Sequence, residues 1–252
     1  MSPASAVRDC WAADRASFNR WEAGLNRSDI RIVGISSSPR HANTEILVKE
    51  ALAAASAKYG VATQFVTFKG KHINGCLDCR ACVRRRMPTI QEQCVQKDDW
   101  RELVTPLLDP VPNGVIIGSP VYFFNVNATL RAFMERCTSL AKPYWNPEIP
   151  HRPPDWSRTA AGALAVGYHR HGGEEHAIST IIQWFLVNGF AVVGSHDQMD
   201  GPLGYIGGAG WQDATGKKTT DAVKEDEWGL RCARAVGEKV AYTAILLASG
   251  SL

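Results

Sequence analysis

The sequence predicts a doubly wound α/β domain, in which a parallel sheet carries helices on both faces. Short runs of β-branched or small apolar residues alternate five times with segments of helical periodicity. The repeats are about 30 to 50 residues apart, as in successive β–α units. The composition, with 45% hydrophobic and 21% charged residues, is that of a globular protein. We therefore expect one domain with a five-stranded parallel sheet over residues 29–252.

The expected elements follow one another along the chain. Residues 31–35 are a β-branched run and predict a strand buried on both faces. Residues 45–60 have apolar positions at helical spacing and end at a glycine. Residues 61–68 alternate in polarity and predict the second strand. The remaining elements are a helix over 97–109, a strand over 114–124, a helix over 127–140, a strand over 159–169, a helix over 174–189, a strand over 190–195 and a helix over 226–249.

Two segments lie outside this alternation. Residues 1–28 precede the first strand and predict an N-terminal arm that packs on the body or on a second subunit. Residues 75–95, GCLDCRACVRRRMPTIQEQCV, contain four cysteines and predict a long loop inserted after the second strand.

Charge and hydropathy exclude several classes of partner. The formal net charge of +3 is too small to indicate a nucleic-acid partner. No apolar run reaches the roughly 18 residues that a membrane span needs. The first residues lack an apolar signal core, and seven cysteines, an odd number, do not suit a disulfide framework. We expect a cytoplasmic protein with reduced thiols.

The loop after the first strand, GISSSPRHANTE, predicts a phosphate site. It has neither the G-x-G-x-x-G pattern of a dinucleotide fold nor the lysine of a P-loop. It instead brings serine and threonine hydroxyls, one guanidinium and one amide to a helix N-terminus, which favours anions. A helix cap with incidental hydroxyls is the alternative interpretation.

Two further loops follow strands at the same edge of the predicted sheet. Residues 118–130 begin with an apolar, aromatic turn, and residues 167–175 contain paired glycines. Because ligands of parallel sheets bind at the carboxyl ends of the strands, these loops and the phosphate loop would surround one ligand. A ligand that has both a phosphate group and a flat ring would fit these loops, and flavin mononucleotide (FMN) is such a ligand. Core packing of Tyr122 and Phe123, and a simple turn at Gly172 and Gly173, are the alternatives.

These segments resemble the flavodoxin-like NAD(P)H-dependent FMN reductases, and within them the iron–sulfur flavoproteins. The likeness extends over residues 30–247 and includes GISSSPRHANTE, GSPVYFFNVNATLRAFMER, CVQKDDW and GYHRHGGEE. It departs at Trp100, where methionine is usual, and at Glu174, where glutamine is common. The resemblance implies a flavodoxin-like fold, bound FMN, NAD(P)H as co-substrate, and a homodimer or homotetramer. It assigns to the FMN phosphate Ser36, Ser38, Arg40, Asn43 and Thr44, and to the ring Pro120, Val121, Tyr122, Phe123, Gly167, Arg170, Gly172 and Gly173.

The resemblance also implies a [4Fe–4S] cluster on four cysteines. Cys76, Cys79 and Cys82 match the first three ligands, and Cys94 matches the fourth because VQKDD follows it. Eleven residues separate Cys82 from Cys94, a longer gap than is usual in the family. A longer loop can still close, since closure entropy rises slowly with length. Cysteines without metal, a zinc site and a redox disulfide remain open as alternatives. Outside this group, Cys10, Cys137 and Cys232 are interpreted as buried or helical residues.

The expected function is that of an FMN-dependent oxidoreductase. It would transfer electrons between NAD(P)H or a ferredoxin-type donor and a small acceptor such as a quinone or nitroaromatic. Alternatives are a clusterless NAD(P)H:FMN or quinone reductase, and an electron carrier or redox sensor that docks ferredoxin on Arg84–Arg86. Tyr168 or His169 as a proton donor to the substrate is a further hypothesis.

Overall fold

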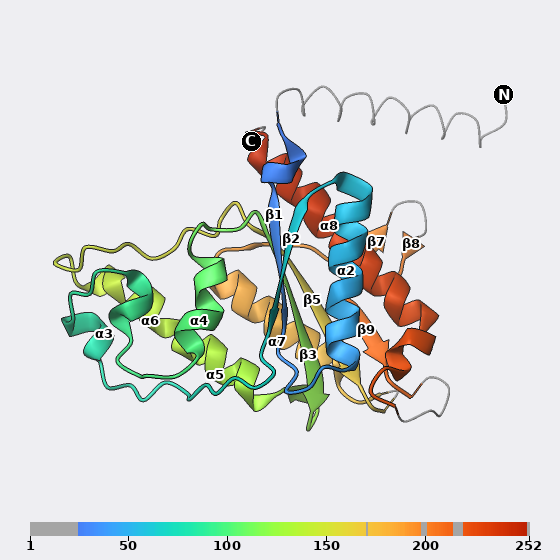
Figure 1. Cartoon of the computed structure of the whole chain (residues 1–252), viewed down its shortest axis with the longest axis horizontal. Coiled ribbons are helices and arrows are strands. Elements are labelled where there is room, and N and C mark those ends of the chain that lie inside the picture. The colour runs from blue at the N-terminus through green and yellow to red at the C-terminus, as the bar shows by residue number, and fades with distance from the viewer. Residues whose placement is uncertain (1–24, 170, 198–200, 214–218, 251–252) are drawn as a thin grey trace.

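The computed structural model describes residues 25–169, 171–197, 201–213 and 219–250. The predicted arm therefore lies almost wholly outside the described residues, as do Cys10 and Arg170. Figure 1 shows a central sheet with helices on both sides. No helix in the described ranges is both long and apolar enough to cross a membrane.

The main sheet is parallel and has the strand order β2-β1-β3-β5-β6. This order reverses direction between β1 and β3, which creates the switch point where flavodoxin-like folds bind ligands. The predicted fold class is confirmed. The strands of this path are β1 (Arg31–Ser36), β2 (Ala62–Thr67), β3 (Gly114–Tyr122), β5 (Ala160–Gly167) and β6 (Ala191–Val192).

The fifth position of the sheet is shared by two short strands. β6 pairs only with Ala160 and Ala161 of β5, while β9 (Gly208–Trp211) pairs in parallel with Leu164–Gly167. The strand predicted over 190–195 was therefore too long. The backbone instead turns, so that the Ser195 N–H donates to the Tyr205 carbonyl at 3.2 Å. Two further short strands, β7 (His196–Asp197) and β8 (Gly201–Pro202), pair with each other.

Helices on each face bury a separate apolar core. Helices α2 (Asn43–Tyr59) and α8 (Glu227–Ala248) cover one face, and α4 (Trp100–Val104), α5 (Ala128–Arg136) and α7 (Glu174–Val187) cover the other (Figure 1). β3 supplies both cores, with Ile116 in the first and Val115 and Ile117 in the second. This alternation is that of a strand buried on both faces.

Several helices are shorter than predicted. The helix expected over 97–109 is α4 followed by a 3₁₀ turn over Thr105–Leu107, where Pro106 lacks the N–H that would continue the helix. The helix expected over 127–140 is divided into α5 and α6 (Thr138–Ala141), and a 3₁₀ turn over Lys142–Trp145 follows. The remaining elements are α3 (Ala81–Arg84), β4 (Asn125–Val126) and 3₁₀ turns over Arg27–Asp29, Ile90–Gln93 and Ala222–Glu225.

Candidate functional site

The three predicted ligand loops meet at one edge of the sheet. β3 lies between β1 and β5, with Ser36 opposite Gly118 and Gly118 opposite Leu164. Because the three strands are parallel and in register, the loops that leave their carboxyl ends are neighbours. The structure thus brings the predicted phosphate and ring segments together around the switch point.

The phosphate loop is folded by its own serines. Ser36 and Ser38 are buried, and Thr44 is buried in the first turn of α2. The Ser38 hydroxyl accepts from the Arg40 N–H at 3.1 Å and donates to the Arg40 carbonyl at 2.8 Å. Arg40 itself is exposed. The Glu45 and Ile46 N–H groups in the first turn of α2 donate to the Ala42 carbonyl, and a helix N-terminus of this kind favours an anion.

Asn43, a predicted phosphate ligand, makes other contacts. Its Oδ1 accepts from the Val223 N–H at 2.9 Å, and its Nδ2 donates to Gln212 Oε1 at 3.3 Å and to the Thr219 carbonyl at 3.4 Å. These bonds attach the start of α2 to the segment after β9. Sequence reasoning missed this role because the partners lie far along the chain.

Ser37 and Asn127 form a second link that sequence reasoning missed. The Ser37 hydroxyl donates to Asn127 Oδ1 at 2.8 Å, and Asn127 Nδ2 donates to the Ser37 carbonyl at 2.7 Å. Both residues are buried. The pair joins the phosphate loop to the residue that precedes α5, and the only signal in the sequence was an asparagine at the start of a predicted helix.

A tight hairpin forms the predicted ring loop. Tyr122 of β3 pairs with Asn125 of β4, so Phe123 and Phe124 are its two central residues. Their φ angles are +50° and +71°, as in a type I′ turn, which usually takes asparagine and glycine. Two aromatic residues in this region are strained, a feature that clusters at functional sites. Phe123 is fully exposed, and Pro120 and Val121 lie before it in β3.

The loop after β5 packs against this hairpin. A Cβ built on Gly173, where φ is +106°, would lie 2.7 Å from the Phe124 carbonyl oxygen. The Phe124 ring also stacks on His176, with centroids 5.8 Å apart. The glycine is therefore required for the hairpin to approach α7 this closely.

A buried carboxyl group supports the same loop. Glu174 is 4% exposed, and its Oε2 accepts from the Gly172 N–H at 2.9 Å. A Cβ on Gly167 would lie only 1.9 Å from its Oε1, so the carboxyl fills the space beside that glycine. Burial raises the pKa of Glu174 and favours its neutral form. That form is uncharged, like the glutamine that is common at this position.

The predicted proton donors are adjacent side chains. Tyr168 is half-buried and His169 is exposed, and their rings meet edge-on with centroids 4.8 Å apart. The Tyr168 carbonyl accepts from Trp211 Nε1 at 3.0 Å, which places Trp211 of β9 in the wall behind this loop. Proton donation by Tyr168 or His169 stays a prediction.

The four motif cysteines line one hollow. Cys76 and Cys79 are exposed, and Cys82 and Cys94 are half-buried. Arg136 at the end of α5, two residues of α6 and Lys142 also line this hollow. Cys137 and Cys232 are buried elsewhere, as predicted, and burial raises the pKa of Cys137 to about 12. Among described residues, no three histidine, cysteine, aspartate or glutamate side chains are arranged to hold a single metal ion.

The long gap before Cys94 is folded back by Gln93. This side chain is fully buried, and its Nε2 donates to the Cys82 carbonyl at 3.0 Å and to the Arg85 carbonyl at 2.9 Å. Its Oε1 accepts from the Met87 N–H at 2.9 Å. Three hydrogen bonds of the Gln93 side chain therefore hold the segment before Cys94 against residues 82–87.

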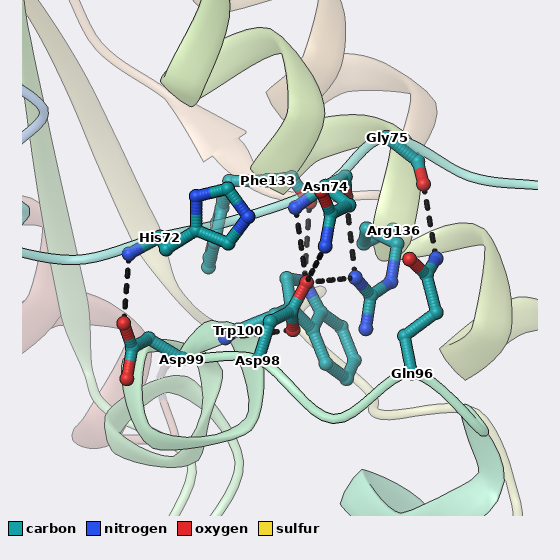
Figure 2. Close-up of polar contacts among 9 residues, drawn as sticks. All are labelled: His72, Asn74, Gly75, Gln96, Asp98, Asp99, Trp100, Phe133 and Arg136. Atoms are coloured by element: carbon teal, nitrogen blue, oxygen red, sulfur yellow. Dashed lines mark hydrogen bonds and ion pairs between the residues drawn. The ribbon is translucent and has the colours of Figure 1, made fainter.

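A buried ion pair closes the base of the cysteine segment (Figure 2). Asp98 Oδ2 accepts from Arg136 Nη1 at 2.7 Å and from the Asn74 N–H at 2.9 Å, and the Asp98 and Arg136 side chains are 2% and 1% exposed. Burial opposes ionisation of Asp98, but these hydrogen bonds outweigh it and lower its pKa. Gln96 Nε2 also donates to the Gly75 carbonyl at 2.9 Å.

The arginines of the cysteine segment mostly hold it together. Arg84 Nη2 donates to the Cys79 carbonyl at 3.0 Å, and Arg85 Nη1 donates to the Glu92 carbonyl at 3.0 Å. Arg86 forms an ion pair with Glu148. Each of these three arginines therefore contacts another group of the chain.

Comparison with known proteins identifies the family. The family model of the NADPH-dependent FMN reductases matches residues 30–200. The chain belongs to this family. It is therefore an FMN-dependent oxidoreductase, and the suggested resemblance is confirmed.

Two curated relatives of this FMN reductase match most of its length and almost all of their own. An iron-sulfur flavoprotein of Methanocaldococcus jannaschii is 35% identical over 86% of this chain and 99% of its own. An iron-sulfur flavoprotein of Archaeoglobus fulgidus is 35% identical over 83% of this chain and 95% of its own. Among solved structures, a flavone reductase has a TM-score of 0.56 at 16% identity, over 85% of this chain and 63% of that one. The last similarity shows the fold alone.

Replacing Gly173 by alanine is expected to weaken FMN binding by roughly tenfold or more, because backbone strain of about 1–3 kcal/mol is added beside the ring loop. The new Cβ would collide with Phe124 as described above. Gly189→Ala is the matched control, since Gly189 also has a positive φ, +80°, but nothing lies within 4 Å of its Cβ position. Titration of flavin fluorescence measures both variants. Equal FMN affinities would contradict the assignment of this loop to the flavin site.

Proposed function

We propose that this FMN reductase is an iron–sulfur flavoprotein that transfers electrons between NAD(P)H or a ferredoxin-type donor and a small acceptor such as a quinone or nitroaromatic. The observation that carries the proposal is that Cys76, Cys79, Cys82 and Cys94 line one hollow despite the long gap in sequence. The two curated relatives described above, both named iron-sulfur flavoproteins, support it.

The residues at the sheet edge suit FMN. The buried hydroxyl of Ser36 and the backbone of the first turn of α2 offer donors for a phosphate, and Ser38 shapes the loop through its bonds to Arg40. The Phe123–Phe124 hairpin and the loop to Gly173 would hold the flat ring between them. When bound, FMN exchanges two electrons with a hydride donor and releases them singly, and a cluster carries one electron at a time.

The donor set of the hollow suits a thiolate-ligated cluster. Four thiols are available, and Lys142, which is 9% exposed, lies in the same wall and acts electrostatically on Cys82 and Cys76. A positive charge in this place offsets the negative charge that thiolate ligands bring. The same four cysteines are the ligands that we propose for the [4Fe–4S] group.

A clusterless NAD(P)H:FMN or quinone reductase is the second candidate. It is favoured by the exposure of Cys76 and Cys79. The carrier hypothesis receives less support, because Arg84, Arg85 and Arg86 already bind groups of the chain itself.

An absorption spectrum of anaerobically purified protein, with iron and acid-labile sulfide assayed on the same sample, tests the proposal. We expect flavin absorption together with about four irons and four sulfides per chain. Cys82→Ser should lose most of the iron, whereas Cys137→Ala, which removes a buried thiol outside the hollow, should keep it. Flavin without iron in the wild-type protein would support the clusterless reductase instead.

A further inference from the structure

Three polar residues outside the cysteine segment form one wall of the cysteine hollow. Arg136, Ser139 and Lys142 are spaced three apart along α5, α6 and the following turn, and all three line the cysteine hollow. Residues at this spacing lie on one side of a helical path. Their exposed fractions are 1%, 5% and 9%, so the wall is buried although every member is polar.

Two of these residues have unused hydrogen-bonding capacity. Ser139 Oγ and Arg136 Nε are buried atoms that have no partner among the described residues. Buried polar atoms are almost always satisfied, and an exception in a native protein calls for a missing water, ion or ligand. Both orphans belong to residues that line the same hollow as the four thiols, which points to an acceptor there.

The third residue adds a positive charge. Lys142 Nζ donates to Asp78 Oδ1 at 3.1 Å, and Asp78 lies between Cys76 and Cys79 in the chain. The Asp78 side chain is 72% exposed, while the lysine is almost fully buried. The ammonium group is thus held inside the hollow by an aspartate of the cysteine segment.

We propose that Arg136, Ser139 and Lys142 are a donor wall that hydrogen-bonds the sulfur atoms of the cluster held by the four cysteines and stabilises its reduced state. The inference rests on the proposed function. Hydrogen bonds to cluster and thiolate sulfurs, and nearby positive charge, raise the reduction potential because reduction adds negative charge. These three residues therefore determine how readily the cluster accepts an electron.

Redox titration of the cluster-loaded protein, followed by electron paramagnetic resonance, tests the wall. At the wild-type midpoint, Lys142→Met should raise the ratio of oxidised to reduced cluster about tenfold, equivalent to a fall of about 59 mV for one electron. Ser139→Ala should raise the ratio about threefold in the same direction.

Ser195→Ala is the matched control. Ser195 Oγ is also buried and without a partner in the described part of the chain, but Ser195 does not line the hollow. Its variant should keep the wild-type potential. A second measurement uses chelator-treated protein: Ser139→Ala should then be at least as stable as wild type, because it removes an unsatisfied hydroxyl.

The outcomes separate the two proposals. Lowered potentials in Ser139→Ala and Lys142→Met, with Ser195→Ala unchanged, support the donor wall. Unchanged potentials in variants that retain wild-type iron overturn the wall and leave the proposed function standing. A wild-type protein that binds FMN but no iron overturns the proposed function and the wall with it.

Discussion

Replacing Asp98 by alanine is expected to lower the free energy of unfolding by about 3–5 kcal/mol, because it leaves the Arg136 guanidinium buried without its charge partner. The two side chains are 2% and 1% exposed, and their contact is 2.7 Å long. The variant also removes the acceptor for the Asn74 N–H. Denaturant titration of the apoprotein measures the change.

Glu148→Ala is the control for this prediction. It breaks the exposed ion pair with Arg86, whose partners are 59% and 65% exposed, and should cost less than about 1 kcal/mol. If both substitutions cost the same, the Asp98–Arg136 pair does not hold the base of the cysteine segment.

The Asp98 pair also gives stability a defined pH dependence. The folded-state pKa of Asp98 is lowered, so its stabilisation is complete above the ordinary aspartate pKa of about 3.9 and is lost as the pH falls through the folded value. We therefore expect the wild-type protein to lose its advantage over Asp98→Ala in acid below about pH 4.

Replacing Gln93 by leucine is expected to release the cluster at least tenfold faster to a chelator while the domain stays folded. The substitution leaves the Cys82 and Arg85 carbonyls and the Met87 N–H without their partner, at about 1–3 kcal/mol for each group that remains buried. The segment before Cys94 then opens locally, and the fourth ligand is no longer held near the third. This prediction rests on the proposed function.

Iron release and near-ultraviolet circular dichroism would be followed together for this variant. Gln91→Leu is the matched control, since Gln91 lies in the same 3₁₀ turn but is only half-buried. Equal release rates in the two variants would show that the gap closes without Gln93.

Much of the fold could be predicted because local patterns and tertiary packing agree. The first helix ends at Gly60, which adopts φ +69° as a C-cap should. The second strand of the fifth position, β9, could not be predicted, because two of its four residues are glycines, which have low β propensity, and only its pairing with β5 makes it a strand.

The candidate sites were predictable to different degrees. Loop positions followed from the parallel sheet, and the ends of β1, β3 and β5 are adjacent as expected. The aromatic type I′ turn at Phe123 and Phe124 has no sequence signal, since that turn normally requires asparagine or glycine. The role of Gln93 depends on its complete burial, which no local pattern indicates.

The fifth position of the sheet, which β6 and β9 share, has a consequence for synthesis on the ribosome. Until residues 208–211 emerge, the carboxyl half of β5 has no neighbour on that side, although β1, β2 and β3 are already available to pair. Such an edge can recruit strands from other nascent chains. Completion of the ligand-binding edge is thus a late event, and chains truncated before β9 are predicted to aggregate.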